Sequence, residues 1–413
     1  MKTIYLSKHW VVLAVSVVLF AGCSCDNKQK EKNTTNQPKQ QEIPVDKALQ
    51  QRLADFANKP RTKGAFGFQV YDLTADKPVY GYNQNVSQPS ASCLKLLSGV
   101  AGLRLLGTKY LYRSTIYTRG KVVRDTLRGD VTFKADLDPQ LMAPDLSMFA
   151  KALRRRGIRG FEGKLYLDLL LQEPVKSEEH WYPWDLTFSK YGVLYKGAPR
   201  VANELKRALR SQGITVRDSQ VVMGRLPVGS HAIFRFYRSI DRVTARMWKH
   251  SSNTQATSML YTIGHHVNPK LEPTQAGVNY LRTFLRDSIN MKDTSLVVHD
   301  GCGLCTYNRL SPMALTTILR YAYQHKDIYQ LLYNQLSLSG VDGTLRMELN
   351  SPQLRGRIRG KTGTLSHPYG ISSLAGYCRG SNGHILAFAV MDHDMSVLDA
   401  RVLQTKLGKA LVE

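Results

Sequence analysis

Alternating apolar and polar residues predict β-strands towards both ends of the chain. Residues 65–83 alternate on either side of a turn at Thr74–Lys77, which predicts a hairpin. From residue 354 onward, three apolar runs follow one another, with the turn sequence RGSNG before the last, and they predict three further strands. Residues 396–412 then repeat apolar residues at helical spacing, which predicts a helix after these strands.

Helical periodicity and short strands share the middle of the chain. Residues 92–106 have apolar residues at helical spacing and stop before Gly107, a residue typical of helix C-caps. Further helices are predicted over residues 146–156, 200–212, 241–264 and 274–290. Short strands are predicted within 115–172 and again up to about 237, with turn signals at Gly129-Asp130 and Asp138-Pro139.

This order of elements predicts an α+β architecture. One sheet built from the strands towards both ends, with the middle of the chain inserted between them, fits this order. The 413 residues, 43% of them hydrophobic, suffice for one to three domains with a large core.

The first residues have the pattern of a secretory signal. Two lysines precede an apolar run over residues 10–20, which is shorter than a membrane span. Small residues follow, and the run LFAGC resembles a bacterial lipobox, so we expect residues 1–22 to be a lipoprotein signal peptide and Cys23 the lipidated residue. Residues 23–48 are rich in Lys, Gln, Asn and Thr, which predicts a disordered tether.

The formal net charge of +25 favours an anionic partner or a basic, solvated surface. No zinc-finger spacing and no RNA-binding aromatic signature accompanies this charge. We therefore do not expect nucleic acid as a partner.

Cys302 and Cys305 form a C-x-x-C motif. No second such motif and no histidine pair at zinc-binding spacing accompanies it, so the spacing does not indicate a metal site. A local disulfide and two free thiols both remain open for an exported protein.

Ser92 and Lys95 stand one turn apart at the start of the helix predicted over residues 92–106. Residues at this spacing lie on one helix face, and the first turn has free backbone N–H groups and a positive dipole end. Burial there would favour a neutral lysine, which can take the proton of a nucleophilic serine. A lysine on a solvated helix face is the alternative, since S-x-x-K also arises by chance.

Two later motifs suit the same chemistry. Lys361-Thr362-Gly363 lies in a glycine-rich strand where an extended peptide could pair, and its cation with the hydroxyls of Thr362 and Thr364 suits a terminal carboxylate. Ser251-Ser252-Asn253 lies at a helix start, where Ser251 could relay a proton and Asn253 could hold a substrate carbonyl. A helix N-cap and a surface hairpin are the structural alternatives, and Ser288-Ile289-Asn290 is a rival for the middle motif.

In this order, S-x-x-K, S-x-N and K-T-G are the signature of serine β-lactamases and penicillin-binding proteins. From about Gly64 onward the chain resembles the D-alanyl-D-alanine carboxypeptidase/endopeptidase family, the type-4 low-molecular-mass penicillin-binding proteins of that superfamily. Supporting stretches are PSAS (89–92), RGDVTFKADLDPQL (128–141), GIRGFEGKLYLD (157–168), WYPWD (181–185), DGCGLCTYNRLSP (300–312) and SGVDGTLRMEL (339–349). The family usually has serines where Cys302 and Cys305 stand.

The resemblance implies a transpeptidase-like fold of the penicillin-binding and serine β-lactamase type, an antiparallel sheet flanked by helices with an inserted smaller α/β domain. We expect the catalytic domain at 49–112 and 238–413 and the insertion at 113–237. About 155 residues separate Lys95 from Ser251, so the insertion is expected to be reduced relative to the family.

The resemblance also implies a serine DD-peptidase that acts on peptidoglycan stem peptides. It would remove terminal D-alanine, cleave D-alanyl cross-bridges or do both, through an acyl-enzyme on Ser92, with β-lactams as covalent inhibitors. Ser92, Lys95, Ser251, Asn253 and Lys361 would be catalytic.

Thr362, Gly363 and Thr364 would bind substrate, and Asp168 would bind the amine of the peptidoglycan diamino acid. No metal or cofactor is implied. We expect a periplasmic lipoprotein whose only membrane contact is the lipid on Cys23, in the outer membrane.

Two other functions remain open. A β-lactamase would turn over penicillin rapidly, although Glu348 and Asn350 lack the E-x-x-L-N spacing of class A enzymes. A non-catalytic β-lactam or peptidoglycan binder would release no D-alanine, and its binding would not depend on Ser92.

Overall fold

The computed structural model describes residues 43–59, 64–187, 190–366 and 370–413. The predicted signal peptide, Cys23 and most of the predicted tether lie outside the described residues. The tether prediction is wrong at its end, because helix α1 (Lys47–Asn58) begins before residue 48. The Asp46 side chain caps this helix by accepting a hydrogen bond from Leu49 N (3.0 Å), and Leu49 is buried. Within the described ranges, no helix combines the length and apolar character of a membrane span.

The first sheet joins strands from both ends of the chain, as the residue pattern predicts. Its order is β11-β12-β13-β14-β1-β2, and every neighbouring pair is antiparallel. The strands are β1 (Ala65–Asp72), β2 (Lys77–Tyr82), β11 (Ser337–Leu338), β12 (Ile358–Leu365), β13 (Ile371–Arg379) and β14 (Ile385–His393).

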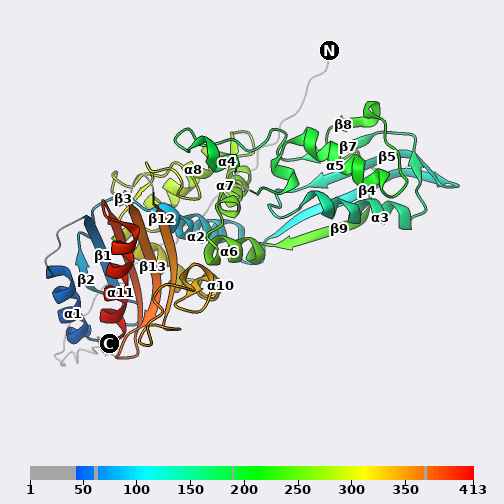
Figure 1. Cartoon of the computed structure of the whole chain (residues 1–413). Coiled ribbons are helices and arrows are strands. Elements are labelled where there is room, and N and C mark those ends of the chain that lie inside the picture. Colours follow the sequence, from blue (N-terminus) through cyan, green and yellow to red (C-terminus); the bar gives the residue numbers. More distant parts are fainter. Residues whose placement is uncertain (1–42, 60–63, 188–189, 367–369) are drawn as a thin grey trace, which may run out of the picture. The chain divides into compact units, whose positions relative to one another are not determined.

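The two faces of this sheet pack against different helices. Phe388 of β14 belongs to the core shared with α1 and α11 (Val397–Val412), whereas its neighbours Ala387 and Ala389 belong to the core on the other face. This period of two is that of a strand buried on both sides. Figure 1 shows α1 and α11 side by side across one face. The core on the opposite face is shared with α2 (Leu94–Leu106), α6 (Ile240–Lys249), α7 (Asn253–Val267), α8 (Pro273–Thr283), α9 (Pro312–Gln324) and α10 (Lys326–Gln335), and α9 packs directly on β1, β13 and β14.

A second, mixed sheet lies in the stretch for which we predict the inserted domain. Its order is β8-β7-β5-β4-β9, with β6 beside β5. The bounds are β4 (Leu111–Val123), β5 (Thr126–Ala135), β6 (Gly160–Phe161), β7 (Leu165–Leu169), β8 (Val221–Met223) and β9 (His231–Ser239). Helices α3 (Ser147–Arg155) and α5 (Ala198–Arg210) complete its separate apolar core. The predicted domain boundaries remain a prediction.

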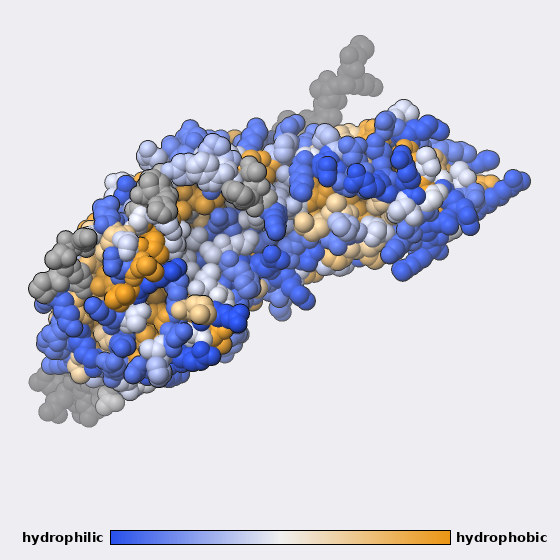
Figure 2. All heavy atoms as spheres, viewed as in Figure 1, coloured by the Kyte–Doolittle hydropathy of each residue, from blue (hydrophilic) through white to orange (hydrophobic). Residues whose placement is uncertain are grey.

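The turn predicted at Gly129-Asp130 is wrong. Both residues lie inside β5, and the hairpin turns between Val123 and Thr126. Gly129 pairs with Gly120 of β4, and a Cβ on Gly129 would lie 1.8 Å from Arg119 O. The glycine therefore permits a close approach of two strands. Most of the surface around this hairpin is hydrophilic in Figure 2, although Val122 and Val123 at its turn are exposed.

The helix predicted over residues 241–264 is also interrupted. It forms two helices, α6 and α7, because Ser251 takes a φ of +54° and Ser252 caps α7. The pattern at 274–290 gives α8 followed by a π-helical turn, Phe284–Ser288. Smaller elements complete the described chain: β3 (Gln88–Pro89), which pairs with β10 (Arg309–Leu310), and α4 (Pro183–Thr187).

Candidate active site

Ser92 lies in a strained turn that leads into α2. The turn is the 3-10 helix Ala91–Cys93, and Ala91 has a φ of +43°. This backbone conformation is unfavourable for a residue with a Cβ and persists only where the surroundings hold it. The turn is thus fixed by its contacts rather than by local preference.

Two hydrogen bonds hold this turn against the first sheet. Ser373 Oγ of β13 donates to Ser90 O (2.7 Å), and Cys93 Sγ donates to Lys361 O of β12 (3.1 Å). Burial raises the pKa of the Cys93 thiol, so it remains a hydrogen-bond donor. Cys93 therefore fixes the turn from behind, facing the strand that carries Lys361.

Lys95 is fully buried, and its amine has three partners. Lys95 Nζ lies 2.6 Å from Ser92 Oγ, 2.7 Å from Asn253 Oδ1 and 2.6 Å from Cys302 O. Burial lowers the pKa of Lys95 to about 8. A neutral amine has two N–H donors for the two carbonyl oxygens and one lone pair for the Ser92 hydroxyl proton. The geometry suits a base that activates Ser92.

Lys361 is a second fully buried amine in the same cluster. Its Nζ lies 2.8 Å from Ser251 Oγ and 2.6 Å from Thr362 O. Burial, and after it the charge of Lys95, lowers the pKa of Lys361 to about 7. The amine can therefore exchange a proton with the Ser251 hydroxyl near neutral pH.

The junction of α6 and α7 presents Ser251 to Lys361. Ser252, the next residue, serves as the N-cap of α7, and its Oγ accepts from Gln255 N (3.4 Å). The capping role that the sequence left open for this motif thus belongs to Ser252. The structure brings Ser251 to Lys361, whereas the rival Ser288 ends the π-helical turn.

Residues 361–365 of β12 have an open edge. On that side β11 pairs with Arg359 and Gly360 only, and within the described ranges no other strand pairs there. Gly363 allows the edge to approach the nucleophile closely, because a Cβ there would lie 3.0 Å from Ser92 N. An extended peptide could add to this edge beside Ser92.

The two threonines of this strand differ in their surroundings. Thr362 Oγ1 donates a hydrogen bond to Thr344 Oγ1 (2.8 Å), whereas Thr364 is exposed. Both stand on the strand that faces the Ser92 turn, as the substrate-binding prediction requires.

Comparison with known proteins decides the family. Residues 49–192 and 193–411 match the sequence model of the D-Ala-D-Ala carboxypeptidase 3 (S13) family. The chain belongs to this family. Along most of its length it is similar to D-alanyl-D-alanine carboxypeptidase DacB of Haemophilus influenzae, with 20% identity over 87% of this chain and 91% of the relative.

Solved structures share the fold of this S13 chain. The crystal structure of penicillin-binding protein 4 (dacB) from Haemophilus influenzae has a TM-score of 0.72 at 19% identity, over 87% of this chain and 98% of its own. Its complex with a β-lactam has a TM-score of 0.69 at 18% identity, over 86% and 98%. A predatory peptidoglycan endopeptidase from Bdellovibrio bacteriovorus has a TM-score of 0.54 at 16% identity, over 83% and 92%. The predicted α+β fold of the penicillin-binding type is confirmed.

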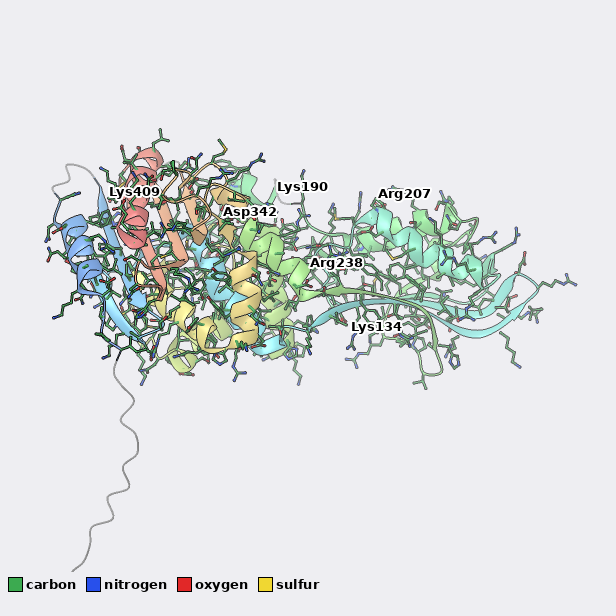
Figure 3. The ribbon with its side chains drawn as sticks, turned by 90° about the horizontal axis from the view of Figure 1, so that it is seen from below. Lys134, Lys190, Arg207, Arg238, Asp342 and Lys409 are labelled. Atoms are coloured by element: carbon green, nitrogen blue, oxygen red, sulfur yellow. The ribbon has the colours of Figure 1, made fainter. Side chains whose placement is uncertain are left out.

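Asp168 lies apart from the cluster around Ser92 in its contacts. It lies in β7, one residue before the end of the strand, where Lys134 Nζ lies 2.9 Å from its Oδ2 and Leu226 N donates to the same oxygen (3.1 Å). Figure 3 labels Lys134 in the part of this S13 chain that holds the second sheet. For the described residues, no contact of Asp168 with the Ser92 cluster is found, and its amine-binding role remains a prediction.

Asp300, which the motifs did not single out, organises the loop behind Lys95. It is buried, and its two oxygens accept hydrogen bonds from Cys302 N, Gly303 N and Cys305 N and from the side chains of Trp181 and Asn308. These bonds aim the Cys302 carbonyl at Lys95. The Asp-Gly pair in the sequence is typical of such a turn, but its partner Trp181 lies too far along the chain to be inferred. Cys302 and Cys305 are free thiols.

Proposed function

We propose that this S13 protein is a serine DD-peptidase of peptidoglycan that forms its acyl-enzyme on Ser92. The family supports the reaction class, and one observation carries the assignment of residues. The dehydrated amine of Lys95 lies 2.6 Å from Ser92 Oγ, with its two other partners both acceptors. Burial favours the neutral amine, and when its two N–H groups donate to these acceptors its lone pair lies towards the Ser92 hydroxyl.

Acylation begins when Lys95 Nζ takes the Ser92 proton and Ser92 Oγ attacks the carbonyl of the penultimate D-alanine. The developing oxyanion accepts hydrogen bonds from the backbone N–H groups of Ser92 and Thr364. Ser251, in contact with Lys361, passes a proton to the departing amine. Water then attacks the ester and frees Ser92 for another cycle.

The stem peptide lies along the open edge of β12. Thr362 and Thr364 hold its terminal carboxylate, with Lys361 supplying positive charge. Asn253 uses its Oδ1 on Lys95, so its amide N–H₂ is the group that holds the substrate carbonyl. Asp168 binds the amine of the diamino acid. The H. influenzae penicillin-binding protein 4, solved with a β-lactam, supports β-lactams as inhibitors that mimic this peptide.

Digestion of purified peptidoglycan tests the proposal. Wild-type protein is expected to release D-alanine or cleaved cross-bridges, identified by mass, and Ser92→Ala is expected to release neither. A labelled penicillin should attach covalently to wild type at Ser92 and not to Ser92→Ala. Correctly folded wild type that never becomes labelled, or that turns penicillin over rapidly, would contradict the assignment.

We also propose that the enzyme is a periplasmic lipoprotein anchored through Cys23. Membrane fractionation of the wild type and of a Cys23 variant tests this anchor. The support is the LFAGC run after a basic and apolar leader. Wild type should remain with the outer membrane, and Cys23→Ala should lose its lipid. Equal membrane retention of both proteins would rule out this anchor.

A further inference from the structure

Beside the loop that supports Lys95, four side chains of metal-binding type converge. They are Glu178, His180, His299 and Cys305, and one ligand atom from each lies within 4.8 Å of the other three. We propose that these residues form a zinc site that joins the segment before α4 to the loop behind the catalytic lysine.

The donor set fits zinc better than the other common divalent ions. Zinc takes four ligands in a tetrahedron from thiolate, imidazole and carboxylate groups, and the cluster offers one thiol, two imidazoles and one carboxylate. Calcium and magnesium prefer oxygen ligands alone. With bonds of about 2.0–2.3 Å, tetrahedral ligand atoms lie roughly 3.3–3.7 Å apart, so the cluster needs shifts of only about 1 Å.

The backbone on both sides of the cluster is already held in place. On one side, Glu178 Oε2 accepts from His180 N (2.9 Å), and Trp181 N donates to Glu178 O (3.0 Å). On the other, His299 N donates to Asn308 Oδ1 (2.7 Å). The two sides are joined directly by a hydrogen bond from Trp181 Nε1 to Asp300 Oδ2 (2.8 Å), and His299 Nδ1 lies 3.8 Å from Glu178 Oε1. Little ordering is left for a metal ion to impose.

The ligands are also reachable from solvent. The side chains of His180 and His299 are 30% and 27% exposed, and a cavity of about 470 Å³ is lined by Glu178 and His299. Cys305 Sγ, by contrast, is enclosed, since the residue is 1% exposed. An ion could therefore enter from the histidine side and be held from beneath by the thiolate.

In the described structure, Glu178 Oε1 and His180 Nδ1 share a hydrogen bond of 2.7 Å. This bond is shorter than the spacing of two zinc ligands, so metal binding would replace it. The spacing of the C-x-x-C motif does not indicate the site, because its ligands come from two separate segments and Cys302 faces Asp300 instead.

The test uses the full-length protein, stripped with a chelator under reducing conditions and titrated with zinc chloride against a chromophoric chelator. We expect one zinc per chain by elemental analysis. Cobalt substitution should give a thiolate-to-cobalt charge-transfer band. Cys305→Ser should abolish the band, and both Cys305→Ser and His299→Ala should weaken zinc binding by more than about 100-fold, because losing even an outer partner of a metal ligand costs about 10–100-fold.

Matched controls keep the outcome specific. Cys378→Ser changes a buried thiol outside the cluster, and His231→Ala changes an exposed histidine of β9, so both should bind zinc as wild type does. Ser92→Ala should also bind normally, which separates this site from the proposed peptidase activity. Far-ultraviolet circular dichroism verifies that each variant is folded. Three results would overturn the proposal. They are zinc below one equivalent at saturation, a zinc affinity in Cys305→Ser and His299→Ala equal to that of wild type, and a Cys305 thiol blocked by a disulfide.

Discussion

At the scale of single residues, the site depends on a lysine deprived of water. Lys95 is fully buried, and this burial lowers its pKa to about 8. An amine whose folded pKa lies below the usual 10.5 becomes neutral as the pH rises through the folded value. The fraction of active base must therefore grow with pH.

We predict that, at saturating labelled penicillin so that loss of the Lys361 charge does not limit binding, acylation of Ser92 accelerates about tenfold between pH 6 and pH 7 and levels off above about pH 8. Labelling reactions quenched at successive times over this pH range measure the acylation rate. Lys95→Arg keeps a charged side chain at every pH and should be inactive throughout. A flat profile in wild type would show that Lys95 is not the base.

Ser251 shows how backbone strain and chemistry meet at one residue. Its φ of +54° lies in the left-handed region, where glycine is favoured, yet its hydroxyl contacts Lys361. A serine here gives up stability for a side chain in the right place, as is common at functional sites.

At the scale of elements, this backbone strain lies at the junction of α6 and α7. A pair of variants distinguishes the effect of the strain on stability from the effect of the hydroxyl on acylation. Ser251→Ala and Ser251→Gly both remove the hydroxyl, so both should slow acylation equally. Ser251→Gly should be the more stable of the two by about 1 kcal/mol, since glycine adopts the left-handed conformation freely. Urea unfolding measures the difference. If the two variants were equally stable, the strain argument would fail.

Elements were predictable from the sequence where their signals are local. The helix of residues 92–106 has its own apolar period and ends at Gly107, and α2 ends at Leu106 as predicted. The continuous helix predicted over residues 241–264 missed the break at Ser251, because apolar periodicity continues across it, although the Ser251-Ser252-Asn253 motif has the residue types of a helix start. The prediction of a turn at Gly129 was wrong because the glycine pairs with Gly120 on the neighbouring strand of the hairpin, a contact that the local sequence does not reveal.

The candidate site shows the same division. Ser92 and Lys95 are close in sequence, so their pairing follows from helix geometry alone. The contact of Lys361 with Ser251 spans 110 residues, and only the three-motif signature pointed to it. Asp300 has no such signature. Most of its donors lie in its own loop, but the donor Trp181 lies 119 residues away in the sequence, so the full set depends on the tertiary fold.

At the scale of the whole molecule, the active site gathers residues from widely separated segments. The proposed nucleophile and base come from the turn that leads into α2 and from its first residues, the proposed proton relay from the α6–α7 junction, and Lys361 from β12. One further contact comes from the segment that follows β7: Trp181 donates to Asp300, whose loop in turn holds the Cys302 carbonyl on Lys95. The segment that follows β7 thus contacts the loop behind Lys95 through Asp300.

We predict that Trp181→Phe slows penicillin acylation by about tenfold, because it leaves a buried carboxylate oxygen of Asp300 one hydrogen bond short and lets the Cys302 carbonyl shift from Lys95. The pH at which acylation levels off should move as well, since the carbonyl is one of the partners that set the state of the amine. Trp184→Phe is the matched control, because Trp184 is 52% exposed and stacks on Tyr182. Labelling rates and pH profiles of the two variants test this prediction. A loss of stability in Trp181→Phe with an unchanged pH profile would limit Trp181 to packing. A displaced pH profile would establish that the segment that follows β7 positions Lys95.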